Sequence, residues 1–282
     1  MEQITIVGAG TMGHGIAQVA AMAGYAAVLV DTQAPVLEKA VASVRSNLEA
    51  GVAKGKVSAD LAEATLLRLK TGTDAAAAAA ESFLVVEAVP ENLELKRNLF
   101  AALDAAAPAE TLLASNTSSL PIGELARATQ RPDRVVGMHF FNPVHIMALL
   151  EIVRGDATSD ETLSRVRQVG EKLGKTCIVV RDVPGFATSR LGVALGLEAM
   201  RMVEAEVASA EDIDLAMTLG YRHPVGPLRL TDLVGLDVRL AIAEHLHTAL
   251  GSPVFEPPEV LRRKVASGEL GKKSGKGFYD WD

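Results

Sequence analysis

Cysteine is almost absent from this chain of 282 residues, which contains one, Cys177. A single thiol cannot form an internal disulfide, so a disulfide framework is excluded. Cys177 lies in the apolar run Thr176-Cys177-Ile178-Val179-Val180, and its neighbours give no support to a reactive thiol. We expect it to pack as a small buried hydrophobe.

Long apolar runs and an excess of basic charge are missing as well. No stretch approaches the roughly 18 residues that a membrane span needs, and the start Met1-Glu2-Gln3 lacks the features of a signal peptide. Lys and Arg number 28 against 35 Asp and Glu, a formal net charge of −7. We expect a cytoplasmic protein in a reducing compartment, with no nucleic acid and no membrane as partner, although a local basic patch could still receive an acidic ligand.

What the chain does have, up to about residue 180, is an alternation of short β-rich runs with helical patterns. This alternation predicts βαβ units and a mostly parallel sheet. Beyond Pro184-Gly185, Leu, Met, Ala and Glu recur at helical spacing from Phe186 to about His247, broken at Gly220 and at Pro224 to Pro227. We therefore expect an α/β domain over residues 1–184 and an all-helical domain over residues 185–282. The strand candidates are Gln3–Gly8, Ala26–Asp31, Ser82–Val89, Thr111–Ser115, Arg134–His139, Leu149–Val153 and Thr176–Val180.

Two segments between strand candidates have their own predictions. Residues 35 to about 70 are too many for one ordinary crossover helix, which predicts two helices or a protruding helical pair. The run Ala75 to Ala80 consists of the best helix former, so we expect a short connecting helix or turn there.

The most specific local pattern near the start is Ile4-Thr5-Ile6-Val7-Gly8-Ala9-Gly10-Thr11-Met12-Gly13. Gly8 permits a tight turn after the strand, Gly10 lets the backbone approach a pyrophosphate, and Gly13 allows the next helix to pack closely on the sheet. The pattern follows an apolar strand and precedes a helical run, which predicts a Rossmann-type dinucleotide-binding domain. The alternative is that the glycines serve only a strand-to-helix turn.

The acid that completes this fingerprint is Asp31, at the end of Val28-Leu29-Val30 and 18 residues past Gly13. Its carboxylate would accept the adenosine ribose hydroxyls and repel a 2′-phosphate. Residues 32–36 contain no Arg that could bind such a phosphate. NAD is therefore predicted over NADP.

A second polar constellation joins Ser115-Asn116-Thr117-Ser118-Ser119 to His139-Phe140-Phe141-Asn142-Pro143 and to Glu151. A hydroxyl, an imidazole and a carboxylate thus stand at or near the ends of short apolar runs. A candidate base of this kind, together with NAD as the bound oxidant, indicates hydride-transfer chemistry.

These motifs occur in an order that resembles the short-chain (S)-3-hydroxyacyl-CoA dehydrogenase family, including bacterial 3-hydroxybutyryl-CoA dehydrogenases. The resemblance covers nearly the whole chain. It implies NAD-dependent, reversible oxidation of a 3-hydroxyacyl-CoA to the 3-ketoacyl-CoA, on a Rossmann domain followed by a helical dimerisation domain. The motifs that carry it are Gly8 to Gly13, Pro90-Glu91-Asn92-Leu93, Ala114 to Ser119, His139 to Pro143, Pro184-Gly185-Phe186 and Gly275-Lys276-Gly277-Phe278-Tyr279.

The resemblance also implies roles for individual residues. His139 is similar to the family's catalytic base, Glu151 to its partner, and Ser118 to the hydroxyl that touches the substrate oxygen. Asn142, within the histidine motif, is assigned to substrate positioning. The positions implied to contact the cofactor are Gly8, Gly10, Thr11, Met12, Gly13, Asp31, Glu91, Lys96 and Asn116.

The chemistry of those side chains supports the three catalytic roles independently of the resemblance. A histidine is well suited to accept the substrate's hydroxyl proton, which must leave as the hydride is transferred. A carboxylate hydrogen-bonded to the far nitrogen of the ring would fix its tautomer. Each has a structural alternative: a histidine closing a strand, a paired core carboxylate, or a hydroxyl that caps the helix beginning near Pro121. Ser115, Thr117 and Ser119 are close competitors of Ser118.

One departure from the family concerns the second domain. Where the family usually has an asparagine before the arginine that follows Pro-Gly-Phe, this chain has Ser189 before Arg190. A hydroxyl is shorter than an amide and offers fewer hydrogen bonds, so this position bears on substrate identity.

A cationic anchor for the CoA phosphates is expected at Lys54, with Lys56 as the near alternative, and a solvated helix end as the other interpretation.

The remaining histidines carry no metal signature. His245 and His247 are two residues apart on a helical pattern and point to different faces, so no metal is predicted.

Two other functions stay open: a dehydrogenase of free 3-hydroxy acids or polyols, and a nucleotide-binding structural or sensor protein without turnover. The apolar content of the helical domain predicts a homodimer through it.

Overall fold

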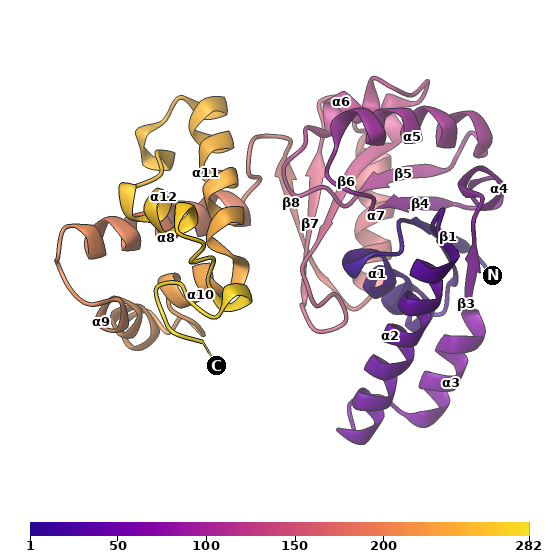
Figure 1. Cartoon of the computed structure of the whole chain (residues 1–282). Helices are drawn as coiled ribbons and strands as arrows, with labels where there is room; N and C mark the ends of the chain where they lie inside the picture. The colour runs from indigo at the N-terminus through magenta and orange to yellow at the C-terminus, as the bar shows by residue number, and fades with distance from the viewer. Residues whose placement is uncertain (282) are drawn as a thin grey trace. The chain divides into compact units, whose positions relative to one another are not determined.

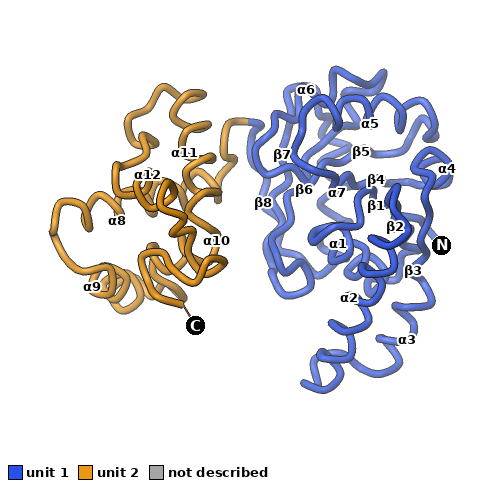
Figure 2. The backbone as a smooth tube through the Cα atoms, viewed as in Figure 1, with its two compact units in different colours: residues 1–182 blue, residues 183–282 orange. Residues whose placement is uncertain are grey.

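The computed structural model describes residues 1–281 of the chain. The backbone forms two compact units, residues 1–182 and 183–282, coloured separately in Figure 2.

The first unit is built on an eight-stranded sheet with the strand order β3-β2-β1-β4-β5-β6-β7-β8. All neighbouring strands are parallel except β6 and β7, which are antiparallel. This is the predicted α/β fold with a mostly parallel sheet. The strands are β1 Gln3–Val7, β2 Ala26–Val30, β3 Leu69–Gly72, β4 Leu84–Glu87, β5 Leu112–Ser115, β6 Val135–Phe140, β7 Leu149–Arg154 and β8 Thr176–Arg181.

The seven strands predicted from the sequence are all present, with ends that differ by one or two residues. The prediction missed β3, an edge strand that pairs only with β2. Its sequence Leu69-Lys70-Thr71-Gly72 is short and half polar, so it carries no alternating or buried apolar run. The helical segment predicted for residues 35 to about 70 overlaps the first two residues of this strand.

Helices cover both faces of the sheet, with α1 and α7 on one side and α5 and α6 on the other (Figure 1). The buried core on the first side includes Ile16 and Val19 of α1 and Val166 and Val169 of α7. The helices of this unit are α1 Thr11–Met22, α2 Ala34–Ala53, α3 Ala59–Arg68, α4 Ala75–Ala79, α5 Leu93–Ala106, α6 Ile122–Ala126 and α7 Asp160–Lys172.

The helices α2 and α3 form a pair that projects from the sheet (Figure 1). Two helices were expected in residues 35–70, and two are found. In α2 the buried residues Leu37, Ala40, Val44 and Leu48 recur at intervals of three or four, so one face packs inward and the other faces solvent. The alanine run forms α4, a short helix as predicted, with Asp74 accepting from the Ala77 N–H as its N-cap.

The second unit is helical, as the predicted fold class requires. Its core joins side chains of α8, α9, α10, α11 and α12, among them Leu197, Met200, Leu228, Leu246 and Leu261. Ala216–Gly220 forms a π-helical turn after α9. The helices are α8 Thr188–Glu204, α9 Ala210–Leu215, α10 Pro227–Val234, α11 Leu236–Leu250 and α12 Glu259–Ala266.

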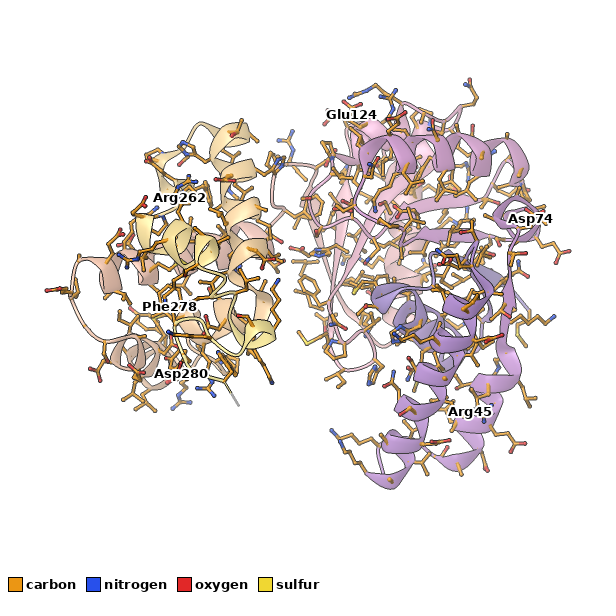
Figure 3. The ribbon with its side chains drawn as sticks, viewed as in Figure 1. Arg45, Asp74, Glu124, Arg262, Phe278 and Asp280 are labelled. Atoms are coloured by element: carbon orange, nitrogen blue, oxygen red, sulfur yellow. The ribbon has the colours of Figure 1, made fainter. Side chains whose placement is uncertain are left out.

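The motif Gly275 to Tyr279 is tied into this helical unit through Asp232 of α10. The buried Asp232 carboxylate accepts from the backbone N–H groups of Phe278 and Tyr279, at 3.0 and 2.9 Å, and from the Trp281 indole at 2.9 Å. A Cβ at Gly277 would lie 2.3 Å from an Asp232 carboxylate oxygen, so only glycine fits there. Figure 3 labels Phe278 and Asp280 in this segment. The residue types of the motif Gly275 to Tyr279 are therefore explained by its packing on Asp232.

Candidate active site

The carboxyl ends of the parallel strands form the edge at which ligands bind in sheets of this kind. The chain runs from β1 outward to β2 and β3, then crosses to β4 on the other side of β1, so the strand order reverses between β1 and β4. The strands β4, β5 and β6 end at Glu87, Ser115 and Phe140. Most of the polar residues singled out from the sequence therefore cluster at one edge.

The glycine loop after β1 has the geometry that a dinucleotide requires. A Cβ at Gly13 would lie 1.7 Å from the Gly8 carbonyl oxygen, and one at Gly8, where φ is +102°, would lie 2.6 Å from the Ala88 carbonyl oxygen. A Cβ at Gly10 would meet nothing within 4 Å. Gly8 and Gly13 thus serve the turn and the packing of α1. The space beside Gly10 is open, so a ligand can approach the protein backbone closely there.

The N-terminus of α1 provides the anion-binding end of this loop. Its N-cap is Gly10, which has no side chain, so no side chain caps the first-turn amides of Thr11, Met12 and Gly13. Uncapped amides and the helix dipole suit a pyrophosphate. Asp31, directly after β2, accepts from the Ala9 N–H at 2.9 Å and from the Gln33 N–H at 3.1 Å, which fixes the carboxylate beside the loop.

Two cavities meet over this edge. The larger, of about 670 Å³, is lined by Gly8, Gly10, Thr11, Met12 and Asp31. The smaller, of about 310 Å³, is lined by Met12, Glu91, Lys96, Asn116, Ser118 and His139. Both are also lined by Ala88 and Val89, so a dinucleotide could extend from one cavity into the other. The residues present therefore fit NAD.

His139 and Glu151 face each other as cross-strand partners on the antiparallel strands β6 and β7. The His139 Nδ1 lies 2.7 Å from Glu151 Oε2, and the glutamate is fully buried. An ionised carboxylate can only accept a hydrogen bond, so we assign the proton of this hydrogen bond to His139 Nδ1. The ring of Phe141 lies with its centroid 4.5 Å from the His139 ring.

The segment after β5 is organised around Glu91. Glu91 Oε1 accepts from the Thr117 hydroxyl at 2.5 Å, the Ser118 N–H at 3.1 Å and the Ser119 hydroxyl at 3.2 Å. Burial works to raise the pKa of the Glu91 carboxyl, but the Lys96 ammonium and these hydrogen bonds outweigh it and lower the pKa. Of the competing hydroxyl residues, Ser118 is the one that lines the smaller cavity.

Sequence reasoning missed a buried carboxylate, Glu87, behind that cavity. Its Oε1 accepts from Lys96 Nζ and from the Val89 N–H, each at 2.7 Å, and its Oε2 accepts from the Ser115 hydroxyl at 2.6 Å. Lys96 Nζ also lies 3.0 Å from Glu91 Oε2. The signal that could have revealed it is an acid closing the apolar strand Leu84-Val85-Val86, beside Ser115 at the end of the next strand.

Three predicted residues lie away from these cavities or cannot be related to them. Asn142 is exposed after β6, and its peptide bond to Pro143 is cis. Lys54 is exposed at the C-terminal end of α2, with Lys56 exposed two residues later. Ser189 lies in the first turn of α8 in the second unit, whose placement relative to the first is not determined. Asn116 is better placed: its Oδ1 accepts from the Phe140 N–H at 2.9 Å, which leaves its amide nitrogen as the donor.

Across residues 1–281, no group of three or more His, Cys, Asp or Glu is arranged to hold a metal ion, and no helix there is long and apolar enough to cross a membrane. Cys177 is half-buried and not fully buried as expected, because β8 is an edge strand and its thiol packs on α7 from one side only. Burial, and then Glu171, raise the pKa of its thiol.

A glycine-rich dinucleotide loop beside a histidine–carboxylate pair is the arrangement of an NAD-dependent dehydrogenase. Comparison with known families is consistent with this. Residues 3–183 match the model of the 3-hydroxyacyl-CoA dehydrogenase NAD binding domain, and residues 185–281 match that of the 3-hydroxyacyl-CoA dehydrogenase C-terminal domain. The chain belongs to the 3-hydroxyacyl-CoA dehydrogenase family, as its motifs predicted, and it is an NAD-dependent oxidoreductase.

Individual relatives are similar over nearly their whole length. A probable 3-hydroxybutyryl-CoA dehydrogenase of Bacillus subtilis is 44% identical over 282 residues, which is 100% of this chain and 98% of the relative. The human mitochondrial hydroxyacyl-coenzyme A dehydrogenase is 42% identical over 288 residues, covering 100% and 91%. The crystal structure of the (S)-3-hydroxybutyryl-CoA dehydrogenase PaaH1 from Ralstonia eutropha has a TM-score of 0.96 and 41% identity, covering 100% and 99%.

Proposed function

We propose that this enzyme oxidises short-chain (S)-3-hydroxyacyl-CoA substrates, such as 3-hydroxybutyryl-CoA, reversibly to the 3-ketoacyl-CoA. The observation that carries the proposal is the His139–Glu151 pair, with His139 lining a cavity that adjoins the glycine loop. The names of relatives that match the whole chain support the substrate class. We assign NAD binding to residues 1–184, and substrate contacts and dimerisation to residues 185–282.

His139 is proposed to act as the base. NAD, when bound, supplies the carbon that accepts the hydride. Because Nδ1 is engaged by Glu151 at 2.7 Å, Nε2 is the nitrogen that would take the proton from the substrate hydroxyl. The buried carboxylate of Glu151 holds the ring in this tautomer and stabilises the imidazolium that forms, as in the triad logic. A base of this kind contributes roughly 10²- to 10⁴-fold in rate.

Ser118 and the neighbouring polar groups are proposed to orient the reactants. Ser118 lines the same cavity as His139, and its N–H is held by Glu91, which supports a role in binding the substrate oxygen. Asn116 presents an amide donor, and Lys96 and Glu91 border the cavity as cofactor contacts. We assign Lys54 or Lys56 to the CoA phosphates, and Asn142 and Ser189 to the substrate.

The helical unit is proposed to form a homodimer. On α10, Leu230, Leu233 and Val234 are 40%, 45% and 41% exposed and lie on one face of the helix, since they are three and four residues apart. Leu219 and Tyr221 nearby in sequence are 74% and 76% exposed. Exposed apolar side chains grouped on one helix face are commonly covered in an oligomer. A cytoplasmic location is part of the same proposal, supported by the single cysteine.

The deciding experiment measures NADH formation with purified protein and (S)-3-hydroxybutyryl-CoA, with the (R) isomer and free 3-hydroxybutyrate as comparisons. We expect turnover with the (S) thioester and little with either comparison. Turnover with the free acid at equal efficiency would favour a dehydrogenase of unactivated substrates, and NAD binding without turnover would favour a sensor. A series of (S)-3-hydroxyacyl-CoA substrates of graded length then gives the chain-length preference.

A further inference from the structure

A cluster of three charged side chains borders the smaller cavity, and its charges do not balance. Glu87 and Glu91 each approach the ammonium of Lys96, at 2.7 and 3.0 Å. Within the described chain neither carboxylate has another cationic partner within 4.0 Å. Two carboxylates and one ammonium leave one excess negative charge.

The source of this excess charge is buried. Glu87 and Lys96 are 0% and 1% exposed, whereas the Glu91 side chain is 37% exposed. Glu87 accepts from Lys96, the Val89 N–H and the Ser115 hydroxyl. Ser115 Oγ itself accepts from the Thr117 N–H at 3.2 Å, so its proton is directed to Glu87. Every contact donates to Glu87, as an ionised carboxylate requires.

Glu87 does not line either cavity, but its neighbours do. Lys96, Ala88 and Val89 stand between Glu87 and the cavity of His139, so the carboxylate is screened from direct contact with a ligand and little screened by water. A buried charge in this position acts through its field.

We propose that Glu87 biases the cofactor site toward the oxidised form of NAD by supplying the excess negative charge of the Glu87–Lys96–Glu91 cluster. The inference rests on the proposed function, which puts the nicotinamide in the cavity of His139. The nicotinamide ring carries a positive charge in NAD+ and none in NADH. A fixed negative charge therefore stabilises bound NAD+ and leaves bound NADH almost unaffected. Glu87 is a positioning residue in this sense, and does not touch the reacting atoms.

The test is a charge series read as a ratio of affinities. Dissociation constants of NAD+ and NADH are measured by calorimetry or NADH fluorescence, without substrate, for wild type, Glu87→Gln, Glu91→Gln and the double variant Glu87→Gln/Lys96→Gln. The cluster charge is −1, 0, 0 and −1 respectively. Losses that affect both forms of the cofactor equally cancel in the ratio.

We expect the ratio of the NAD+ to the NADH dissociation constant to rise about 7- to 30-fold in Glu87→Gln, the range for one unit charge about 8 to 14 Å away at an effective dielectric constant near 20. Glu91→Gln should raise it in the same direction, more weakly because its carboxylate is half-exposed. The double variant should return to within about threefold of wild type. The Glu87→Gln effect should persist at high salt, since the charge is buried.

The matched control is Asp104→Asn, which removes another buried carboxylate paired with a cation, Arg131 at 2.5 Å. Asp104 does not line the cavities, so its ratio should stay at the wild-type value. An unchanged ratio in Glu87→Gln, or in Glu91→Gln if the buried variant does not fold, overturns the inference. So does a double variant with a ratio as high as that of Glu87→Gln. Failure of wild type to bind NAD, or to turn over acyl-CoA, would instead count against the proposed function.

Discussion

His139 Nδ1 and Glu151 Oε2 lie 2.7 Å apart because the antiparallel pairing of β6 and β7 makes the two residues direct cross-strand partners. Side chains of such partners point to the same face of a sheet. The eleven residues between them in sequence form the end of one strand, a short loop and the start of the next. The pair is thus fixed by the register of the two strands.

The first prediction concerns His139→Gln. Loss of the base should lower kcat about 10²- to 10⁴-fold, while the dissociation constant of NAD changes by less than about threefold, because the amides of the glycine loop are untouched. Steady-state kinetics and NAD titration measure the two quantities. His245→Gln, at an exposed site on α11, is the control and should match wild type. Retained turnover in His139→Gln would mean that another group is the base.

The second prediction concerns Glu151→Gln. An amide can donate to Nδ1 and so permits the wrong tautomer, which should lower kcat about 10²- to 10⁴-fold. The dissociation constant of NAD should change by less than about threefold, because Glu151 lines neither cavity. Steady-state kinetics and NAD titration measure the two quantities, and a parallel loss of NAD binding would indicate a general loss of structure instead. Glu124→Gln, in a surface ion pair on α6 (Figure 3), is the control.

The third prediction concerns cofactor choice. Asp31→Ala with Thr32→Arg removes the carboxylate that would repel a 2′-phosphate and adds a guanidinium that can bind it. The ratio of kcat/KM for NADP to that for NAD should rise about 10- to 100-fold, as expected for one or two charge-assisted hydrogen bonds. Thr32→Arg alone keeps Asp31 beside the new charge and should change the ratio far less. An unchanged ratio in the double variant would contradict the ribose assignment.

The sequence predicted the sheet well where strands are buried and poorly where they are not. The strands β1, β4 and β5 are apolar runs with ends marked by glycine or polar residues, whereas β3 has only Leu69 to indicate burial. The antiparallel direction of β7 could have been predicted as well. Residues 141–148 are too few for the crossover of a dozen or more residues that a parallel neighbour needs.

The candidate site was predictable to the extent that each residue carries its own signal. His139 and Asp31 close apolar strands, and the glycines have a fixed spacing. Glu87 has the same local signal as Asp31, an acid after three apolar residues, but its importance depends on Lys96 from α5 and Ser115 from β5. Contacts between three elements cannot be inferred from any one of them. For the same reason Ser118 could not be separated from its hydroxyl neighbours before the cavity was known.

The fourth prediction concerns the oligomer. Leu230→Glu with Leu233→Glu puts two charges on the exposed apolar face of α10, which should convert a homodimer into monomers, since like charges would meet across an isologous interface. Sedimentation velocity at micromolar concentration gives the mass of both proteins. Leu67→Glu, at a side chain on α3 that is 77% exposed, should leave the mass unchanged. A monomeric wild type would contradict the proposed dimer.

The fifth prediction concerns acid stability. The pKa of Glu91 is lowered from its ordinary value of 4.5, so its folded state binds a proton less readily than its unfolded state. The stabilisation is therefore fully present above pH 4.5 and is lost as the pH falls through the lower folded-state pKa. Because the side chain is 37% exposed, solvent screening limits the contribution to about 1 kcal/mol, or roughly 2 to 4 °C in Tm.

Thermal unfolding of wild type and Glu91→Gln between pH 7 and pH 3 measures this contribution. The variant should melt about 2 to 4 °C lower at pH 7, and the difference should shrink toward zero at the acid end. Glu63→Gln, at an exposed site on α3, should show no difference at either pH. A Tm difference between wild type and Glu91→Gln that stays constant from pH 7 to pH 3 would show that the carboxylate contributes by packing. In that case the hydrogen bonds from Thr117, Ser118 and Ser119 would stabilise the fold equally well whether residue 91 is charged or neutral. The Tm difference would then not report the charge of the Glu87–Lys96–Glu91 cluster.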